Sequence, residues 1–362
     1  MNPRLPDHIA GIAPYVPGRP EESIGEVAGG AQPIKIASNE NPLGPSPRAL
    51  EAAVNALHQS HRYPDSSGHL LREALAARHR LPASQILLGN GSTELVELLA
   101  RTFLGRDGWA IMAGQSFVMY RIAVTAVNGR AREVPLNGMR HDLEAMAAAC
   151  GPQTVLVYIA NPNNPTGTYV TAEQIERYFD RLPAGLITVL DEAYAEYIDR
   201  PDYPSGLDLL RQGKRIVVLR TFSKIYGLAG LRIGYCAAPA DLVEGMERVR
   251  SPFNTSRIAQ AAALAALEDE EHLERSRTEN RAGMVRLEEG LRRRKLSFVP
   301  SVANFVLVDV ERDAEEVHQA LLRQGVIARP MGPYRFPTSL RVTIGTEPQI
   351  ELFLRALDGV LT

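Results

Sequence analysis

Cysteine is nearly absent from this sequence of 362 residues, which contains only Cys150 and Cys236. Two cysteines this far apart cannot build the framework of disulfides that holds small secreted domains together. Such sparing use of cysteine is typical of proteins in a reducing compartment, so we predict a cytoplasmic location. The N-terminal stretch agrees with this prediction, because prolines interrupt it and it lacks the continuous apolar core of a signal peptide.

Net charge and long apolar runs are also missing. The 40 lysines and arginines nearly balance the 42 aspartates and glutamates, which gives no electrostatic reason to expect binding to nucleic acids or to acidic membranes. The longest apolar run, 259–267, is too short to cross a bilayer and ends in an acidic run at 268–271. The histidines show no ligand spacing, so we predict no metal site.

Short apolar runs alternate with helical stretches through the first two thirds of the chain. The runs cover residues 86–88, 109–112, 154–160, 186–190 and 216–219. Because these runs are continuous, with no polar residues alternating between the apolar ones, we expect strands that helices cover on both faces. The pattern predicts an α/β fold with a doubly wound, mostly parallel sheet, in which ligands bind outside the carboxyl ends of the strands.

The rest of the sequence predicts two further parts. Residues 1–40 are rich in proline and glycine, and we interpret them as an arm that packs with a small C-terminal domain. A helical stretch at 256–295, either two helices or one bent helix, leads into a small α+β unit. The strands expected in that unit cover 304–310, 326–329 and 340–344, and the helices cover 314–323 and 348–361. The large domain would then span 41–250 and the small domain 251–362.

One stretch, residues 221–234, combines a lysine with hydroxyl and guanidinium groups. Lys224 lies just past the last predicted strand of the sheet, Ser223 precedes it, and Arg232 follows in the same stretch. A lysine amine can form a Schiff base with an aldehyde, while a hydroxyl and a guanidinium can bind a phosphate. The combination suits a phosphorylated aldehyde, although this stretch alone is equally compatible with a solvated surface loop.

A loop at 89–94 offers a second group of phosphate contacts. It joins a predicted strand to a predicted helix, and Gly91, Ser92 and Thr93 place a permissive backbone and two hydroxyls at the start of that helix. The third glycine of a dinucleotide-binding fingerprint is missing, so that interpretation does not apply. For this loop alone, an ordinary capped turn is the alternative.

Two further loops carry polar residues directly after predicted strands. In the loop at 161–167, prolines fix a turn, and the amide of Asn164 can donate to a phenolate oxygen. Asp191 can pair with a protonated ring nitrogen, and Tyr194 can bond the same phenolate as Asn164. Phe117 follows another strand and can either stack on a ring or belong to the core.

Together these loops supply what pyridoxal 5′-phosphate requires of a protein, and a structural explanation would have to hold for all of them at once. The same loops carry motifs by which the chain resembles the fold-type I pyridoxal-phosphate enzymes, and among them the histidinol-phosphate aminotransferase family. These enzymes have an aspartate-aminotransferase-like fold. The motifs span nearly the whole chain and read PYVPG, ASNENPLGPSP, RYPD, GNGSTE, SFVMY, NPNNPTG, DEAY, TFSKIYGLAGLRIGY and LRVTIGT. The first three narrow the resemblance to this family.

The resemblance implies a role for each candidate residue. Lys224 is expected to form the Schiff base, Asp191 to pair with the pyridine nitrogen, and Tyr194 to bond the phenol oxygen; these three are the predicted catalytic residues. The remaining contacts to the cofactor are expected from Gly91, Ser92, Thr93, Phe117, Asn164, Ser223 and Arg232. Tyr63 is expected to reach the phosphate of a neighbouring subunit, which implies a homodimer.

The resemblance also implies transamination of histidinol phosphate with 2-oxoglutarate, as in histidine biosynthesis. The predicted substrate contacts are Tyr15, Asn164, Arg329 and Arg341, and guanidinium groups suit an anionic substrate because each can form two parallel hydrogen bonds to it.

One departure from the family bears on the substrate. Arg335 and Thr338 stand where relatives usually have glycine and asparagine, so Arg335 is expected either to alter the substrate preference or to pair with an acid in the arm. An aromatic amino-acid aminotransferase and a threonine-phosphate decarboxylase are therefore alternatives. A ligand sensor without catalysis is a third, although no basic run or helix-turn-helix segment precedes residue 40.

Overall fold

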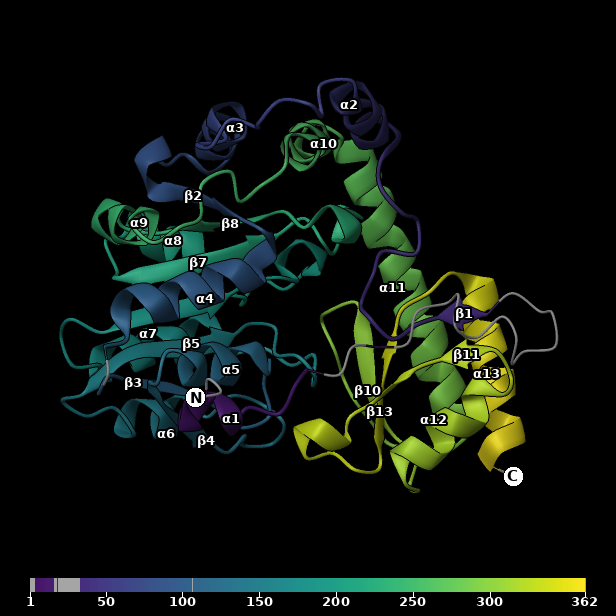
Figure 1. Ribbon diagram of the computed structural model, residues 1–362. Helices are drawn as coiled ribbons and strands as arrows, with labels where there is room; N and C mark the ends of the chain where they lie inside the picture. Colours follow the sequence, from purple (N-terminus) through teal and green to yellow (C-terminus); the bar gives the residue numbers. More distant parts are fainter. Residues whose placement is uncertain (1–3, 16–17, 19–32, 106, 362) are drawn as a thin grey trace.

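The computed structural model describes residues 4–15, 18, 33–105 and 107–361, so much of the predicted arm lies outside the described residues. A sheet of seven strands, the large sheet, dominates the fold, with the order β2-β8-β7-β6-β5-β3-β4 (Figure 1). Its strands are β2 (Ile86–Gly89), β3 (Trp109–Ala113), β4 (Arg130–Val134), β5 (Thr154–Ala160), β6 (Ile187–Asp191), β7 (Ile216–Thr221) and β8 (Gly234–Ala237). Only β8 runs antiparallel to its neighbours, so the predicted mostly parallel sheet is present.

Helices cover both faces of the large sheet, and each strand contributes to both layers because its side chains alternate between the faces. In β2, Leu87 packs in one layer, while Ile86 and Leu88 pack in the other. The first layer contains α4 (Gly91–Phe103), α5 (Met119–Ala126) and α9 (Ala240–Glu247). The second contains α2 (Pro47–Leu57), α3 (His69–His79), α6 (Leu143–Ala148), α7 (Ala172–Arg181), α8 (Gly206–Arg211) and α10 (Arg257–Leu267).

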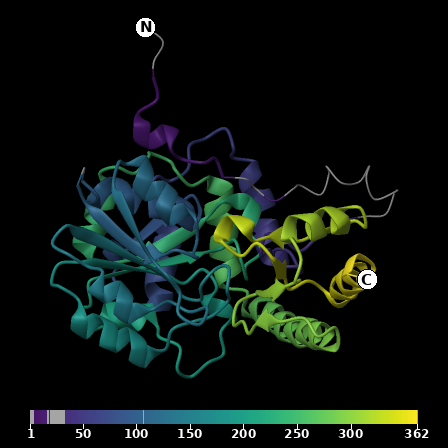
Figure 2. The same ribbon diagram turned by 90° about the horizontal axis from the view of Figure 1, so that it is seen from below.

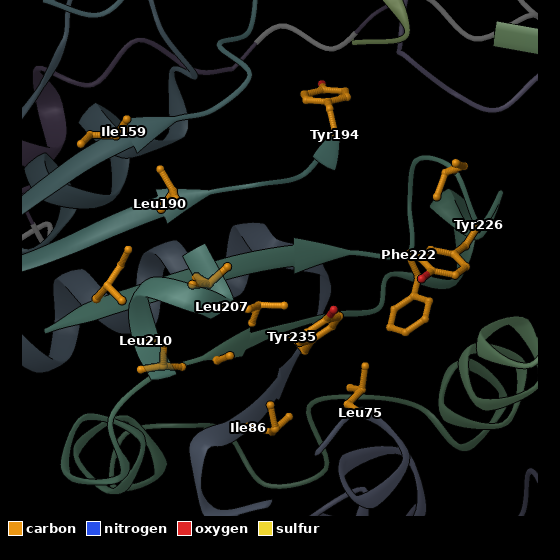
Figure 3. Packing of buried hydrophobic residues seen from close by; sticks show 14 of the residues in the cluster. Leu75, Ile86, Ile159, Leu190, Tyr194, Leu207, Leu210, Phe222, Tyr226 and Tyr235 are labelled. Atoms are coloured by element: carbon orange, nitrogen blue, oxygen red, sulfur yellow. The ribbon is translucent and has the colours of Figure 1, made fainter. Parts of the chain in front are cut away.

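The second layer holds the segment after β7 in place. Figure 3 shows the rings of Phe222, Tyr226 and Tyr235 gathered near the end of that strand. The ring centroids of Phe222 and Tyr226 lie 4.8 Å apart, and Phe222 and Ile225 are both fully buried. These anchors on either side of Lys224 fix the backbone from which its side chain extends.

The C-terminal part of the chain builds a smaller antiparallel sheet, the small sheet, with the order β12-β13-β10-β9. Its strands are β9 (Phe298–Val299), β10 (Phe305–Asp309), β12 (Arg329–Pro330) and β13 (Ser339–Thr343), and it packs with α11 (Glu270–Arg293), α12 (Ala314–Leu322) and α13 (Glu347–Leu361). Figure 2 shows these C-terminal elements beside the large sheet rather than on one of its faces.

Two short elements of the arm contact different parts of the molecule. β1 (Ile34–Lys35) pairs in parallel with β11 (Val326–Ile327), next to the small sheet. α1 (Asp7–Ala10) lies against α5, beside the large sheet (Figure 1). The described parts of the arm therefore contact both α5, which covers the large sheet, and β11, which lies next to the small sheet.

Some elements agree with the sequence-based expectation and others differ from it. The stretch 256–295 forms two helices, α10 and α11, which was one of the two expected alternatives. The strand expected at 326–329 is divided into β11 and β12, which belong to different sheets. β4 and β8 were not predicted, because β4 is a polar edge strand and β8 is a strand of only four residues that begins at the end of the lysine motif. No helix in the described ranges is long and apolar enough to cross a membrane.

Candidate active site

A cavity of about 180 Å³ lies at the carboxyl ends of β5, β6 and β7, where the predicted polar residues follow their strands. Twelve of the fourteen predicted site residues line it: Tyr15, Ser92, Thr93, Phe117, Asn164, Asp191, Tyr194, Ser223, Lys224, Arg232, Arg329 and Arg341. Parallel strands bring these loops together because their carboxyl ends share one edge of the sheet. The fold thus joins residues from most of the chain in a single pocket.

Lys224 follows the end of β7 and extends into this cavity. Its Nζ donates a hydrogen bond to the backbone oxygen of Ser38 at 3.1 Å and lies 5.6 Å from the centre of the Tyr194 ring. Burial, followed by the positive charge of Arg341, lowers the pKa of the Lys224 amine from 10.5 to about 7. A large fraction of this amine is therefore neutral at physiological pH, as a nucleophile or a base must be.

Asp191 ends β6 and is also buried in the cavity wall. Its Oδ2 accepts a hydrogen bond of 2.7 Å from the hydroxyl of Tyr120, and its Oδ1 accepts one of 3.2 Å from the backbone N–H of Ala193. Burial raises the pKa of the Asp191 carboxyl above its ordinary value, and the hydrogen bonds from Tyr120 and Ala193 and the charge of Lys224 offset only part of this rise. The contacts thus favour an ionised carboxylate in a site that would otherwise favour its protonation.

Tyr194 reaches the cavity three residues beyond Asp191. Its hydroxyl oxygen accepts a hydrogen bond of 2.9 Å from the side-chain amide of Asn39, and burial raises its pKa to about 12. Because Asn39 uses one lone pair of this oxygen, the hydroxyl proton remains available to donate elsewhere. Asn39 itself is held by Thr343, whose hydroxyl donates to the amide oxygen of Asn39 at 3.1 Å.

A group of donors gathers at the start of α4. The first-turn amides of a helix lack partners within the helix and attract anions, and here Ser92 and Thr93 occupy that turn. The guanidinium of Arg232 donates to Ser223 Oγ at 3.3 Å and lies against Gly91. A Cβ atom at Gly91 would lie 2.3 Å from Arg232 Nη2, so only glycine lets the backbone and this cation approach so closely. Gly91 therefore shapes the site although it does not line the cavity.

The opposite wall of the cavity is provided by Arg341, in β13. Its Nη1 donates to Asn164 Oδ1 at 2.5 Å and its Nη2 to the backbone oxygen of Ala37 at 2.7 Å. Its buried Nε has no hydrogen-bond partner among the described residues. Arg329 lies nearby, 5.7 Å from the centre of the Tyr15 ring. The wall thus presents two guanidinium groups to any anionic ligand.

Tyr63 does not join this pocket. Its side chain is 78% exposed and stacks on Phe253, with ring centroids 4.6 Å apart.

The guanidinium of Arg335 contacts Glu133 in β4 at 2.5 Å, so the acid that it meets belongs to the large sheet and not to the arm. Neither Arg335 nor Thr338 lines the cavity.

The family model described as aminotransferase class I and II matches residues 31–357. The chain belongs to this family. Curated relatives include histidinol-phosphate aminotransferase 1 of Nitrosococcus oceani, which is 46% identical over 98% of this chain and 95% of its own. The histidinol-phosphate aminotransferase of an Anaeromyxobacter species is 46% identical over 99% of both chains. The predicted histidinol-phosphate aminotransferase family is therefore confirmed.

Solved structures give the same result for this aminotransferase. The crystal structure of histidinol-phosphate aminotransferase from Sinorhizobium meliloti, in complex with pyridoxal-5′-phosphate, superposes with a TM-score of 0.90 at 30% identity, covering 99% of this chain and 97% of its own. An aspartate aminotransferase variant from Thermus thermophilus superposes with a TM-score of 0.82 at 25% identity, covering 98% and 100%. The predicted aspartate-aminotransferase-like, fold-type I architecture is thereby confirmed.

Sequence reasoning missed two residues that this aminotransferase places against the predicted ones. Asn39 contacts Tyr194 and Tyr120 contacts Asp191, although 155 and 71 positions separate the partners along the chain. Both lie inside motifs that carried the resemblance, ASNENPLGPSP and SFVMY. Their polarity was visible, but only the fold shows which group each one meets. In the described part of the chain, no group of three or more histidine, cysteine or acidic side chains could hold a metal ion.

Proposed function

We propose that this chain transfers an amino group from histidinol phosphate to 2-oxoglutarate with pyridoxal 5′-phosphate as cofactor. The observation that carries the proposal is the buried amine of Lys224, which shares one cavity with the side chain of Asp191 and with the donors at the start of α4. Its pKa of about 7 supports a role as nucleophile and base. The names of the curated relatives support the choice of histidinol phosphate.

The residues of the cavity fit the cofactor. Ser92, Thr93, Ser223 and Arg232 form a cluster of hydroxyl, amide and guanidinium donors of the kind that binds a phosphate. We propose that this cluster holds the cofactor phosphate and that Lys224 holds the aldehyde carbon. Asn164, whose oxygen is occupied by Arg341, has its amide N–H groups for the phenol oxygen, together with the hydroxyl of Tyr194.

The chemistry follows from the charge states of these residues. When bound, pyridoxal 5′-phosphate supplies an electron sink for the substrate α-carbon. The Asp191 carboxylate would keep a proton on the ring nitrogen, because an ionised acid pairs favourably with a protonated base. With the cofactor and the substrate bound, Nζ of Lys224 would move the proton from the substrate α-carbon to the cofactor's aldehyde carbon, on the other side of the nitrogen that joins them. Phe117 would pack against the ring face and exclude water.

The two guanidinium groups in the cavity wall are suited to binding an anionic substrate. We propose that Arg341 and Arg329 bind the phosphate of histidinol phosphate and the carboxylates of the oxo acid in turn, because both anions accept two parallel hydrogen bonds from a guanidinium. The Nε of Arg341, which has no partner among the described residues, is one donor available for this purpose. Tyr15 would close the site from the arm.

One further candidate function rests on a specific feature of the cavity. The rings of Tyr15, Phe117 and Tyr334 line it together with the arginines, and such a lining would also suit the side chain of phenylalanine or tyrosine. An aromatic amino-acid aminotransferase is therefore the second candidate. Because transamination is common to both candidates, the substrate distinguishes them.

The test is an assay of the purified protein with 2-oxoglutarate against histidinol phosphate, phenylalanine, tyrosine and threonine phosphate. We expect kcat/KM to be highest for histidinol phosphate by several orders of magnitude, with a keto product and no release of CO₂. A preference for phenylalanine or tyrosine would replace the first candidate by the second. Release of CO₂ from threonine phosphate would contradict both and indicate a decarboxylase.

We propose further that the chain forms a cytoplasmic homodimer in which Tyr63 enters the site of the neighbouring subunit. Its exposed ring, away from its own cavity, supports this role. Leu50, Val54 and Leu57 form an exposed apolar stripe on α2 that a second copy would cover, while Ala49 and Ala53 on the same helix are buried. The two free cysteines suit a reducing compartment.

We also keep the division into an arm at 1–40, a large domain at 41–250 and a small domain at 251–362 as a proposal. The large sheet draws all of its strands from 86–237, and the small sheet draws its strands from 298–343, which supports a boundary between them. The pairing of β1 with β11 supports an arm that accompanies the small domain.

A further inference from the structure

A buried hydrogen bond between Tyr120 and Asp191 has no role in the proposed function. The Tyr120 hydroxyl donates to Asp191 Oδ2 at 2.7 Å, and the Tyr120 side chain is almost completely buried. The two residues come from different layers of the fold, because Tyr120 lies in α5 and Asp191 ends β6. No sequence motif pairs them, and the proposed mechanism uses only Asp191.

Tyr120 also belongs to an aromatic cluster that fixes its position. Its ring stacks on Tyr158, with centroids 4.7 Å apart and an interplanar angle of 11°. The ring of Phe117 meets it edge to face, with centroids 5.5 Å apart. Tyr120 therefore touches both the aromatic side chain expected on the cofactor ring and the acid expected at the ring nitrogen. A phenol held this firmly has little freedom to turn its hydroxyl away from Asp191.

The direction of the hydrogen bond follows from burial. Burial and the nearby charge of Asp191 raise the pKa of the Tyr120 phenol well above 10, so it remains a donor. The other titratable groups around Asp191 are Tyr194 and Tyr203, which follow β6, and Lys224, which follows β7. Of these four side chains, only that of Tyr120 donates a hydrogen bond to the carboxylate.

We propose that Tyr120 is a positioning residue that keeps the Asp191 carboxylate ionised and turned toward the cofactor's ring nitrogen. The inference rests on the proposed function only in naming that ring nitrogen. With Tyr120 on Oδ2 and Ala193 on Oδ1, each oxygen has one partner from the protein and still has lone-pair capacity for a further donor. Without Tyr120, burial would favour the protonated carboxyl, and the side chain would lose the contact that sets its rotation.

The test uses Tyr120→Phe, which keeps the ring and its stacking and removes only the hydroxyl. Tyr158→Phe is the matched control, because the Tyr158 ring stacks in the same cluster but its hydroxyl contacts only the backbone oxygen of Val96, at 3.5 Å. The full-length chain without cofactor is labelled with ¹³C at the aspartate carboxyls, and Asp191→Asn assigns the signal. We expect Tyr120→Phe to raise the pKa of the Asp191 carboxyl and Tyr158→Phe to leave it unchanged. Equal titration in both variants would overturn the proposal.

The second readout is the affinity for pyridoxal 5′-phosphate, measured by titrating the cofactor into the same proteins. Loss of a hydrogen bond to a charged group should weaken binding by about tenfold or more in Tyr120→Phe. The loss should disappear when Asp191→Asn is already present, whereas a general disturbance of the pocket would persist in that background. If Tyr120→Phe still weakened cofactor binding in the Asp191→Asn background, the proposal would be contradicted. Failure of the unmodified chain to bind the cofactor would contradict the proposed function instead, and the ¹³C titration would still stand.

A third variant covers the case in which Tyr120→Phe does not fold. Replacement of Tyr120 by 3-fluorotyrosine preserves the shape and makes the phenol a stronger donor, so it should lower the pKa of the Asp191 carboxyl. An unchanged or higher pKa in that protein would sink the inference.

Discussion

The amine of Lys224 carries a pH dependence that extends beyond catalysis. Its pKa is about 7 in the folded chain against 10.5 ordinarily, so between these values the unfolded chain binds a proton that the folded chain lacks. The contribution of Lys224 to the free energy of unfolding therefore rises from about pH 7 to about pH 10.5. Below this window the folded chain bears the full penalty of a buried charge.

Comparison with Lys224→Met tests this expectation. Urea unfolding of the two cofactor-free proteins should show the unmodified chain destabilised relative to the variant at pH 7, with the difference shrinking toward pH 10. The difference between the two free energies of unfolding excludes the titration of all other groups, because these groups are common to both proteins. A difference that does not depend on pH would contradict the depressed pKa. Turnover should be abolished in the variant if Lys224 is the catalytic amine.

Gly91 allows a second prediction at the scale of one residue. Its φ of +72° lies in the left-handed region, where an L side chain costs about 1–2 kcal/mol, and a Cβ would displace the Arg232 guanidinium. Gly91→Ala should therefore weaken binding of pyridoxal 5′-phosphate by about tenfold or more, since a displaced cation loses its charge-assisted hydrogen bonds. Fluorescence titration measures this affinity. Gly230→Ala is the control, because nothing lies within 4 Å of its Cβ position and its effect should be small.

At the scale of elements, the turn Gly332–Tyr334 and strand β4 are joined by one ion pair. Arg335 follows this turn and contacts Glu133, which also accepts a hydrogen bond of 3.2 Å from Arg121 in α5. Arg335 is largely exposed, so the pair should contribute no more than about 1 kcal/mol to stability. Its φ of +65° favours glycine, which offsets part of that contribution.

We therefore expect Arg335→Gly to change the free energy of unfolding by less than about 1 kcal/mol. The ratio of kcat/KM for histidinol phosphate to that for phenylalanine should change by less than about threefold, because the guanidinium does not line the cavity. Glu133→Gln removes the same ion pair without altering the turn, and it should have equally small effects on the free energy of unfolding and on this ratio. A large change of this ratio in Arg335→Gly alone would show that the guanidinium acts directly on the substrate.

The elements also show how far the sequence could predict this fold. Continuous apolar runs identified β5 and the other central strands, because burial on both faces leaves no polar positions in them. β4 was missed because its burial alternates, as expected at an exposed edge, and β8 because it is only four residues long and begins at the end of the lysine motif. The range 314–322 formed a helix close to the predicted one because the Asp313 cap and the apolar spacing mark it locally.

The candidate site also has features that the sequence could predict and features that it could not. Lys224, Asp191 and Asn164 were predictable because each follows a strand, and the carboxyl ends of parallel strands converge. The contacts of Asn39 and Tyr120 were not, because a hydrogen bond between residues from distant parts of the chain leaves no local pattern. Arg335 attracted attention because relatives usually have another residue type at its position. Its partner Glu133 could be identified only from the packing of two sheets.

At the scale of the whole molecule, the proposed homodimer would complete each site with Tyr63 from the second copy. A chain with Lys224→Ala and a chain with Tyr63→Ala should each be nearly inactive as homodimers, because every site then lacks one of the two residues. In a mixed dimer, one site carries both changes and the other carries neither. Refolding the two chains together in equal amounts makes about half of the dimers mixed, so about a quarter of the unmodified activity should return.

This recovery requires both an assembly and a shared site, which makes it a sharp test of the dimer. Sedimentation equilibrium should show a dimer for each variant, and Leu50→Asp with Val54→Asp should shift it toward monomer, since charges would replace apolar side chains of the α2 stripe. The paired change Arg292→Asp with Arg293→Asp, at the exposed end of α11, is the matched control and should leave the dimer intact. Dimers without recovered activity would show that Tyr63 serves its own subunit, whereas monomers with full activity would show that the site needs no partner.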